Sequence, residues 1–221
     1  DAEWGIGMRL DSIADFPWNM SLGAIENDSI IFAVGKEIGF QCKRLGVHLN
    51  FAPVVDINTN PNNPIIGNRS FGENEYLISK QANSFINGMQ SVGVLGSAKH
   101  FPGHGDTTKD SHKTLPVIEF SKERIFNTEL FPFQEAIKNN IASIMVAHLE
   151  IPSIEKTNNL PSTLSDIIID SILKKRLKFK GLIITDALDM KGVAGYSKMN
   201  VDLKAFLAGN DILLMSLNVK D

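Results

Sequence analysis

Residues 99–112 hold a dense group of side chains that can move protons or bind anions. The segment reads KHFPGHGDTTKDSH and contains three histidines, two aspartates and two lysines. A short apolar run, residues 91–98, precedes it and predicts a buried strand. Ordinary connecting loops have no need for so many titratable groups. The sequence therefore predicts that this loop carries a function.

Asp110 and His112, near the end of this loop, form a candidate proton-transfer pair. In a loop, a spacing of two lets the carboxylate reach an imidazole nitrogen, orient the ring and stabilise its protonated form. His112 could then give a proton to a leaving oxygen and take one back from water. The spacing alone is equally compatible with a loop histidine that is hydrogen-bonded for structural reasons.

Asp186 is a candidate nucleophile because it ends the apolar run GLIITD. A carboxylate at the carboxyl end of a strand could attack the anomeric carbon of a sugar and form a covalent intermediate. The alternative is an aspartate that caps the following helix. Asp189 is a rival carboxylate that lies further out in the same loop.

Three cations could bind hydroxyl, carboxylate or carbonyl oxygens: Arg9, Arg69 and Lys99. Taken singly, such cations more often lie on a solvated surface. Lys99 and His100 are adjacent, and neighbours on a regular strand point to opposite faces. If both contact one ligand, we expect a kink or bulge near residues 101–102.

A metal site is the alternative use of the histidine loop. His100, His104, Asp110 and His112 have side chains that bind zinc in other proteins. The spacing of the first two resembles a helical zinc pair, but Pro102 excludes a regular helix there. The sequence has no HExxH motif. We therefore expect no metal and no other cofactor.

Composition and charge are those of a globular chain. The 221 residues are 43% hydrophobic and 21% charged, with a formal net charge of −3. This charge gives no reason to expect a nucleic acid partner. Cys42 is the single cysteine, so no internal disulfide is possible. No apolar run approaches the roughly 20 residues of a membrane span, so none is expected in this chain.

Short apolar strands alternate with amphipathic helices along the chain. The strands are predicted at residues 47–55, 91–98, 142–148, 181–186 and 211–216, and the helices at 29–45, 75–92, 121–139, 165–177 and 201–208. Pro132 is expected to bend or split the third helix. This alternation predicts a parallel sheet of the α/β class.

Polar side chains follow each predicted strand, which favours one architecture over another. They are Asp56, Lys99 with His100, His148, Asp186 and Ser216. A (β/α)₈ barrel gathers such groups at the carboxyl ends of its strands. A doubly wound sheet would concentrate them at one switch point instead. We therefore predict a barrel, here a truncated portion that lacks the first strands and the last one.

Several motifs make the chain similar to a known enzyme family. KHFPGHGDTTKDSH closely resembles the signature of family 3 glycoside hydrolases, in the bacterial β-N-acetylglucosaminidase (β-hexosaminidase) branch. The resemblance continues, in the family's order, at DAEWGIGMR, FAPVVDIN, IIGNRSFG and TDALDM. It covers residues 1–221, as part of the family's N-terminal catalytic barrel domain.

The resemblance implies roles for eight residues. Asp186 matches the nucleophile, and His112, paired with Asp110, matches the general acid/base. The remaining matches are sugar-binding positions: Asp1, Arg9, Arg69, Lys99 and His100. For His104, which lies in the same motif, we expect a role in the architecture of the loop.

The implied activity is retaining hydrolysis of a terminal β-linked N-acetylglucosamine in peptidoglycan fragments. The implied partner is the saccharide substrate, and the branch includes intracellular recycling enzymes, so a cytoplasmic or a periplasmic location stays open. Transfer to phosphate stays open as a side reaction, and so does the oligomeric state. Two other interpretations remain: a metal-dependent barrel hydrolase, and a non-catalytic sugar-binding fragment.

Overall fold

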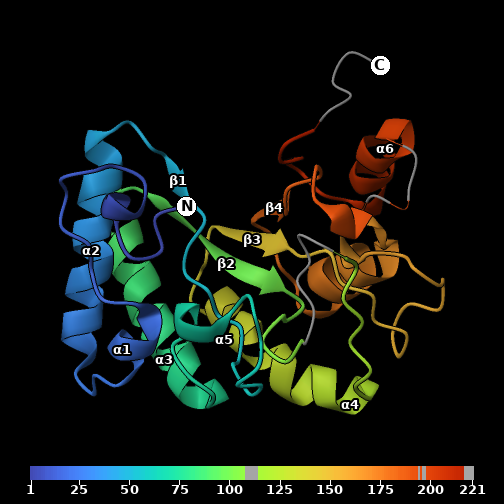
Figure 1. Cartoon of the computed structure of the whole chain (residues 1–221), viewed down its shortest axis with the longest axis horizontal. Helices are drawn as coiled ribbons and strands as arrows, with labels where there is room; N and C mark the ends of the chain where they lie inside the picture. Colours follow the sequence, from blue (N-terminus) through green and yellow to red (C-terminus); the bar gives the residue numbers. More distant parts are fainter. Residues whose placement is uncertain (108–113, 194, 196–197, 217–221) are drawn as a thin grey trace.

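A computed structural model of the chain describes residues 1–107, 114–193, 195 and 198–216 (Figure 1). The predicted acid/base pair, Asp110 and His112, lies outside the described residues. Four strands form one sheet in chain order, and each pair is parallel. They are β1 (Leu49–Asn50), β2 (Leu95–Phe101), β3 (Ser143–Val146) and β4 (Leu182–Thr185).

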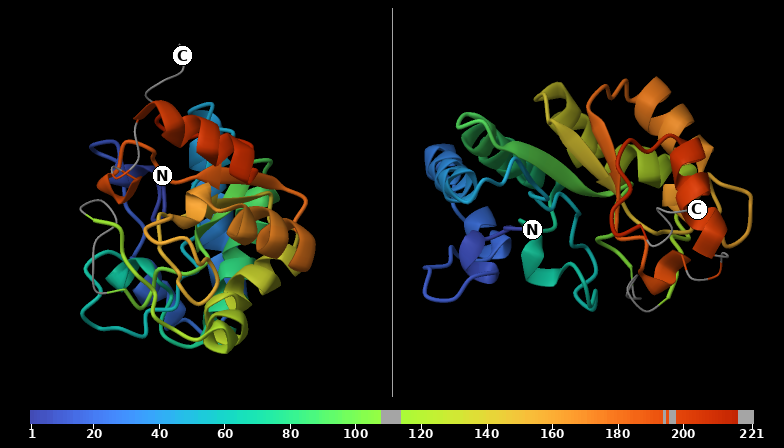
Figure 2. Two further views of the ribbon diagram at one scale, coloured as in Figure 1. Left: turned by 90° about the vertical axis from the view of Figure 1, so that its right-hand side faces the viewer. Right: turned by 90° about the horizontal axis from the view of Figure 1, so that it is seen from above.

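Long helices connect the strands and cover one side of the sheet (Figure 2). They lie in an arc in chain order, with α2 packed on α3 and α3 on α5. The longer helices are α2 (Asp28–Arg44), which precedes β1, and then α3 (Glu75–Gln90), α5 (Phe131–Lys138), a π-helix (Ile167–Arg176) and α6 (Lys198–Ala208). Helices on one face and strands in sequential order make this α/β fold a parallel half-barrel, as the predicted barrel requires.

The remaining helices are short. They are α1 (Asn19–Gly23), α4 (Lys122–Arg124), a π-helix (Ile125–Glu129) and 3₁₀ turns at Ile6–Met8, Gly67–Arg69, Ser162–Leu164 and Lys191–Val193. Within the described part of the chain, no helix is long and apolar enough to cross a membrane.

The predicted helices at 29–45 and 75–92 are confirmed as α2 and α3. Each has an asparagine N-cap: Asn27 accepts the Ser29 amide, and Asn74 accepts the Tyr76 and Leu77 amides. The two helices approach closely, since a Cβ added at Gly35 would clash with the Phe85 carbonyl oxygen. This packing buries the apolar faces that the sequence periodicity indicates.

The core lies between the sheet and the arc of helices. Its fully buried side chains include Phe85, Met89, Phe133 and Ile144. A smaller apolar cluster, which includes Leu164, Leu188 and Ala205, packs under α6. The strands are therefore held in place by packed apolar side chains.

Two predicted strands are much shorter than expected. The strand at 47–55 is reduced to β1 and a single bridge between Val54 and Lys99. Pro53 interrupts the ladder because it has no amide hydrogen to donate. The strand at 211–216 is reduced to a bridge between Ile184 and Ile212. There the Asp211 carboxylate accepts the Ile183 amide at 2.8 Å, so a side chain takes the place of a ladder bond.

The helix predicted at 121–139 is divided, as expected from its proline. Ser121 caps α4 by accepting the Arg124 amide at 3.3 Å. A π-turn follows, and α5 begins at Phe131, so that Pro132 stands in its first turn where a missing amide hydrogen costs nothing. The helix predicted at 165–177 is found as a π-helix with Ser165 at its start, and its wider turns were not predicted.

Candidate functional site

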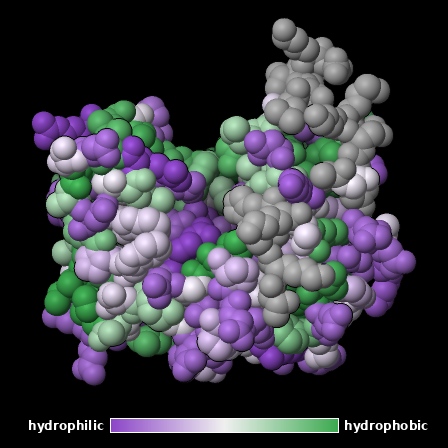
Figure 3. All heavy atoms as spheres, viewed as in Figure 1, coloured by the Kyte–Doolittle hydropathy of each residue, from purple (hydrophilic) through white to green (hydrophobic). Residues whose placement is uncertain are grey.

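A cavity of about 400 Å³ opens at the carboxyl ends of the strands. In Figure 3, which has the view of Figure 1, the molecule is hollowed between its left and right halves, and hydrophilic residues gather in the hollow. The cavity is lined by residues from seven separate segments: Asp1, Phe51, Ile65, Arg69, Lys99, His100, His104, Met145, Asp186, Ala187, Asp189, Met190, Leu214 and Met215. Five of the eight predicted site residues are in this set: Asp1, Arg69, Lys99, His100 and Asp186.

Lys99 is the centre of a buried ion cluster on one wall of the cavity. Its Nζ lies 2.7 Å from Glu3 Oε1 and 2.7 Å from Asp1 Oδ1. Arg69 holds the same glutamate with two bonds, Nε to Oε2 at 3.0 Å and Nη2 to Oε1 at 2.8 Å. Two cations are thereby fixed in place by carboxylates, with donors directed at the cavity.

The charges in this cluster stabilise one another. Burial raises the pKa of Glu3, but Lys99 and Arg69 outweigh it and lower this pKa to about 2. Burial lowers the pKa of Lys99, against the opposing effect of Glu3. Glu3 is therefore an essential part of the wall, although only its two partners were predicted as site residues.

Glu3→Gln should destabilise the protein by about 3 kcal/mol at pH 7, because it leaves Lys99 and Arg69 buried without their carboxylate. The folded-state pKa of Glu3 is depressed, so its contribution is present above pH 4.5 and is lost as the pH falls toward 2. Urea unfolding at pH 7 and at pH 2.5 measures the free energy of unfolding of both proteins. The stability gap between wild type and variant should shrink at the lower pH.

Asp170→Asn is the matched control, since the ion pair of Asp170 with Lys175 is exposed. Exposed pairs contribute little, so this variant should unfold like the wild type at both pH values. A Glu3→Gln protein as stable as the wild type at pH 7 would show that the cluster does not hold the wall together.

Asp56 is the second carboxylate that was not predicted as a site residue. It is buried and accepts His100 Nδ1 at 2.7 Å and the amide of His104 at 2.7 Å. Burial raises the pKa of Asp56, but His100 and His104 lower it below the usual value. Arg69 lies 3.3 Å from His100 Nε2 and can only donate, so Nε2 accepts and Nδ1 carries the hydrogen. Asp56 thereby fixes the ring of His100.

Lys99 and His100 both line the cavity. The required irregularity is present, because the pairing of β2 with β3 shifts register between Ala98 and Phe101. It falls just before residues 101–102, where the sequence predicted it. The strand therefore presents two consecutive side chains to one cavity.

His104 is buried and is held by its surroundings. Its ring Nδ1 lies 2.7 Å from Thr107 Oγ1, and its carbonyl accepts Asn63 Nδ2 at 2.8 Å. Burial, followed by His100, lowers the pKa of His104 to about 4. The next residue must be glycine, since a Cβ at Gly105 would clash with the Ile57 carbonyl. These bonds fit the expected role of His104 in the architecture of the loop.

Asp186 follows β4 at the floor of the cavity. Its amide donates to the Val146 carbonyl at 2.8 Å, which ties it to the end of β3. Burial raises its pKa, but His100, His148, the Ala187 amide and Lys99 together hold it below the usual value. The carboxylate is therefore ionised at neutral pH, which a nucleophile requires. Its Oδ1 accepts the Ala187 amide at 2.8 Å.

Arg9 does not line this cavity. Its guanidinium is exposed and lies 3.0 Å from Asp1 Oδ2, on the outer side of that carboxylate. Arg9 therefore contacts Asp1 and not the cavity itself. Among the residues that the structure describes, no group of three or more His, Cys, Asp or Glu side chains could hold a metal ion.

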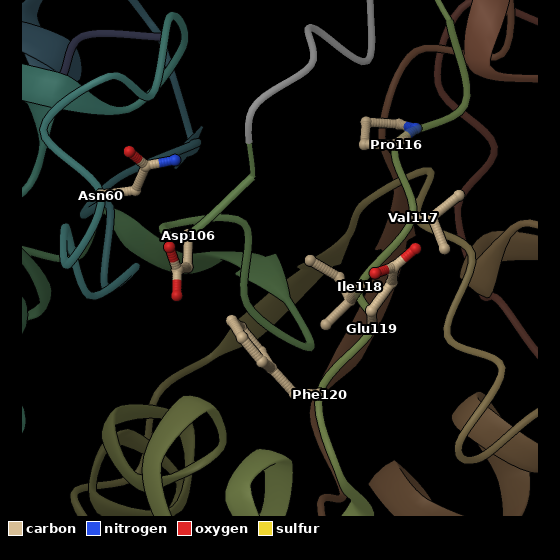
Figure 4. A pocket seen from close by; sticks show the side chains of 7 residues that line it. All are labelled: Asn60, Asp106, Pro116, Val117, Ile118, Glu119 and Phe120. Atoms are coloured by element: carbon tan, nitrogen blue, oxygen red, sulfur yellow. The ribbon is translucent and has the colours of Figure 1, made fainter.

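A second cavity, of about 410 Å³, lies between the segment around Asn60 and residues 116–120 (Figure 4). Asp106 points into it, and Arg124 Nη2 joins Asp106 at 2.9 Å to Glu129 at 3.4 Å. The guanidinium also stacks on the Phe120 ring at 3.7 Å. Glu129 packs against Gly103, where an added Cβ would lie 3.0 Å from the Glu129 Cβ.

Glu129→Gln should stabilise the protein at pH 8. Burial raises the pKa of Glu129 to about 7, against the opposing effect of Arg124. A raised pKa means that the contribution of this carboxyl is most favourable below pH 4.5 and is lost as the pH rises through 7. We expect the variant to gain about 2 kcal/mol over wild type at pH 8 and little at pH 4. Urea unfolding at both pH values measures the gap, and a gap independent of pH would contradict this assignment.

The sequence matches the model of the glycosyl hydrolase family 3 N-terminal domain over residues 1–220. A relative from Pseudoalteromonas piscicida, named beta-hexosaminidase A, is 36% identical over 237 residues, which cover 100% of this chain and 40% of that protein.

Solved structures of similar enzymes agree with this family match. A family 3 β-N-acetylglucosaminidase from Paenibacillus sp. FPU-7 is 39% identical with a TM-score of 0.92, over 97% of this chain and 41% of that one. NagZ from Neisseria gonorrhoeae, solved with N-trifluoroacetyl-D-glucosamine, is 30% identical with a TM-score of 0.83, over 93% and 60%. This chain therefore spans 40% to 60% of the length of these three relatives.

Proposed function

Because this chain belongs to glycosyl hydrolase family 3, we propose that it removes terminal β-linked N-acetylglucosamine, with net retention, from peptidoglycan fragments. The observation that carries this proposal is the shared cavity of Asp186 with Asp1, Arg69, Lys99 and His100. An ionised carboxylate beside fixed donors and acceptors is what a glycosidase needs to hold a sugar over its nucleophile. The names of the relatives support N-acetylglucosamine as the sugar.

In the first step of the proposed mechanism, Asp186 attacks the anomeric carbon while His112 protonates the glycosidic oxygen. The carbon–oxygen bond to the leaving group breaks, and a glycosyl ester of Asp186 forms. In the second step, His112 removes a proton from water, the water oxygen attacks the anomeric carbon, and the ester bond breaks. The two displacements restore the β configuration. Asp110 orients His112 and stabilises its protonated form.

The binding roles follow from hydrogen-bonding capacity. The Asp1 carboxylate accepts from sugar hydroxyls, while Lys99 and Arg69 donate to them. Arg9 acts through Asp1, whose outer oxygen it neutralises. Phe51, Met190 and other apolar side chains form the rest of the wall and can contact the apolar face of a pyranose ring.

Turnover of a chromogenic N-acetylglucosaminide tests the proposal. The assay should compare this chain with a version extended to the full length of the relatives, with and without added phosphate. Proton NMR of the first product should show the β anomer. Release of the α anomer would overturn retention, and inactivity of both proteins would overturn the enzyme assignment. Activity of the longer protein alone would show that this chain does not turn the substrate over by itself, as the interpretation of a non-catalytic fragment expects.

A chelator added to the same assay separates the metal-dependent alternative. A metal-free glycosidase should keep its full rate in the presence of the chelator. Loss of the rate, restored by added zinc, would favour a metal-dependent hydrolase instead.

A further inference from the structure

His148 is a buried histidine that the mechanism above does not use. It lies two residues after the end of β3, which pairs with the end of β4, where Asp186 stands. Its side chain is fully buried, and its Nε2 lies 2.9 Å from the carbonyl oxygen of Ala187. A carbonyl oxygen can only accept, so Nε2 must carry a hydrogen and donate it.

A turn from a distant part of the chain surrounds this histidine. Thr163 Oγ1 lies 2.8 Å from His148 Nδ1. Ser162 donates its hydroxyl to the carbonyl before His148 and accepts the amide after it, from Leu149. The turn is itself held, because Asn210 Nδ2 donates to the Thr163 carbonyl at 2.9 Å. The ring of His148 is therefore locked on both of its nitrogens.

Ala187 connects this locked ring to the proposed nucleophile. Its carbonyl oxygen is held by His148, and its amide donates to Asp186 Oδ1 at 2.8 Å. Both groups flank one alanine, so anchoring the carbonyl limits how far the backbone can turn and where the amide points. With Oδ1 assigned to that amide, attack on the sugar falls to Oδ2.

We propose that His148 is a positioning residue for Asp186, which it holds through the Ala187 backbone with Thr163 setting its ring. This inference rests on the proposed function, since it explains how the nucleophile is kept in one orientation. A displacement of about 1 Å at a reacting atom can lower the rate about 10²-fold. A buried residue that contacts a reacting residue indirectly usually affects the rate because it fixes the orientation of that reacting residue.

Variants of the two residues test the proposal in the protein that turns over the chromogenic substrate. His148→Leu should lower kcat about 10²-fold with little change in KM, because the sugar contacts remain. His148→Gln keeps an amide donor for the Ala187 carbonyl and should recover at least about tenfold of that loss. Thr163→Val, which removes the hydroxyl alone, should lower kcat less than His148→Leu.

Ser143→Ala is the matched control. Ser143 is buried at the start of β3, the strand that precedes His148, and donates to the Gly96 carbonyl at 2.9 Å, at the opposite end of the strand from Asp186. This variant should lose thermal stability but keep kcat. If His148→Leu keeps the wild-type kcat, or if His148→Gln is no better than His148→Leu, the positioning role is wrong.

NMR decides the question independently of turnover. The imidazole nitrogens of His148 should show a hydrogen on Nε2, and the Asp186 carboxyl should titrate at a higher pH in His148→Leu than in wild type. An inactive wild type with these NMR results would overturn the proposed function and leave the arrangement of His148 supported. A bare Nε2, or an unchanged Asp186 titration, would overturn the arrangement itself.

Discussion

Asp186→Ala is expected to lower kcat by at least about 10⁴-fold, the scale on which an enzyme fails when its nucleophile is removed. The loss should be as large for substrates with an activated phenolate leaving group. Such substrates need little acid assistance, but they still need the carboxylate that attacks the anomeric carbon. Rates for an aryl N-acetylglucosaminide and for a disaccharide, measured on the same preparation, give both values.

Two further variants make this result specific. Asp186→Asn preserves the volume of the side chain and should be as inactive as the alanine variant. Asp189→Asn changes the other carboxylate that lines the cavity and should keep most of the activity. Added azide should restore part of the rate of Asp186→Ala by attacking in place of the missing carboxylate. An active Asp186→Asn protein together with an inactive Asp189→Asn protein would exchange the two roles.

His112→Ala is expected to act in a different way, which depends on the leaving group. For an unactivated disaccharide the rate should fall by about 10²- to 10⁴-fold, the usual contribution of a general acid. For an activated phenolate the formation of the glycosyl ester should be almost unaffected, and the slow step should become its hydrolysis. Pre-steady-state kinetics should then show a burst of phenolate that the wild type lacks.

Asp110→Asn provides the companion experiment to His112→Ala. An amide can still orient the ring, but it stabilises the protonated form less well. The alkaline limb of the kcat/KM profile should therefore move to lower pH, because the general acid loses its proton earlier, with a smaller loss of rate than in His112→Ala. Equal losses for activated and unactivated substrates in His112→Ala would show that His112 is not the acid.

Local sequence patterns were sufficient to predict most of the helices and strands of this protein. The helical pattern of the sequence predicted α2 and α3 nearly to the residue, and short β-branched runs marked β3 and β4. The polar residue after each strand then located the cavity, because parallel strands bring their carboxyl ends to one edge. The positions of Lys99 and Asp186 followed from this rule.

The carboxylates behind the cavity could not be found in the same way. Glu3 is bound to Arg69, 66 positions along the chain, and Asp56 to His100, 44 positions along. A pattern within one element gives no information on such pairs, which form only when the fold brings distant loops together. The one available signal was the position of Asp56 directly after a predicted strand. The π-turns and the exact place of the shift in β2 depend likewise on tertiary packing.

The ion cluster around Lys99 has a consequence for the thermodynamics of sugar binding. Lysine and arginine side chains lose much rotational entropy when a ligand immobilises them, about 2 kcal/mol for each. Here Glu3 has already immobilised Lys99 and Arg69 during folding, before any sugar arrives. In a calorimetric titration with N-acetylglucosamine, the loss of side-chain entropy of Lys99 and Arg69 on binding should accordingly be small. The binding enthalpy should come mainly from the hydrogen bonds that the sugar forms.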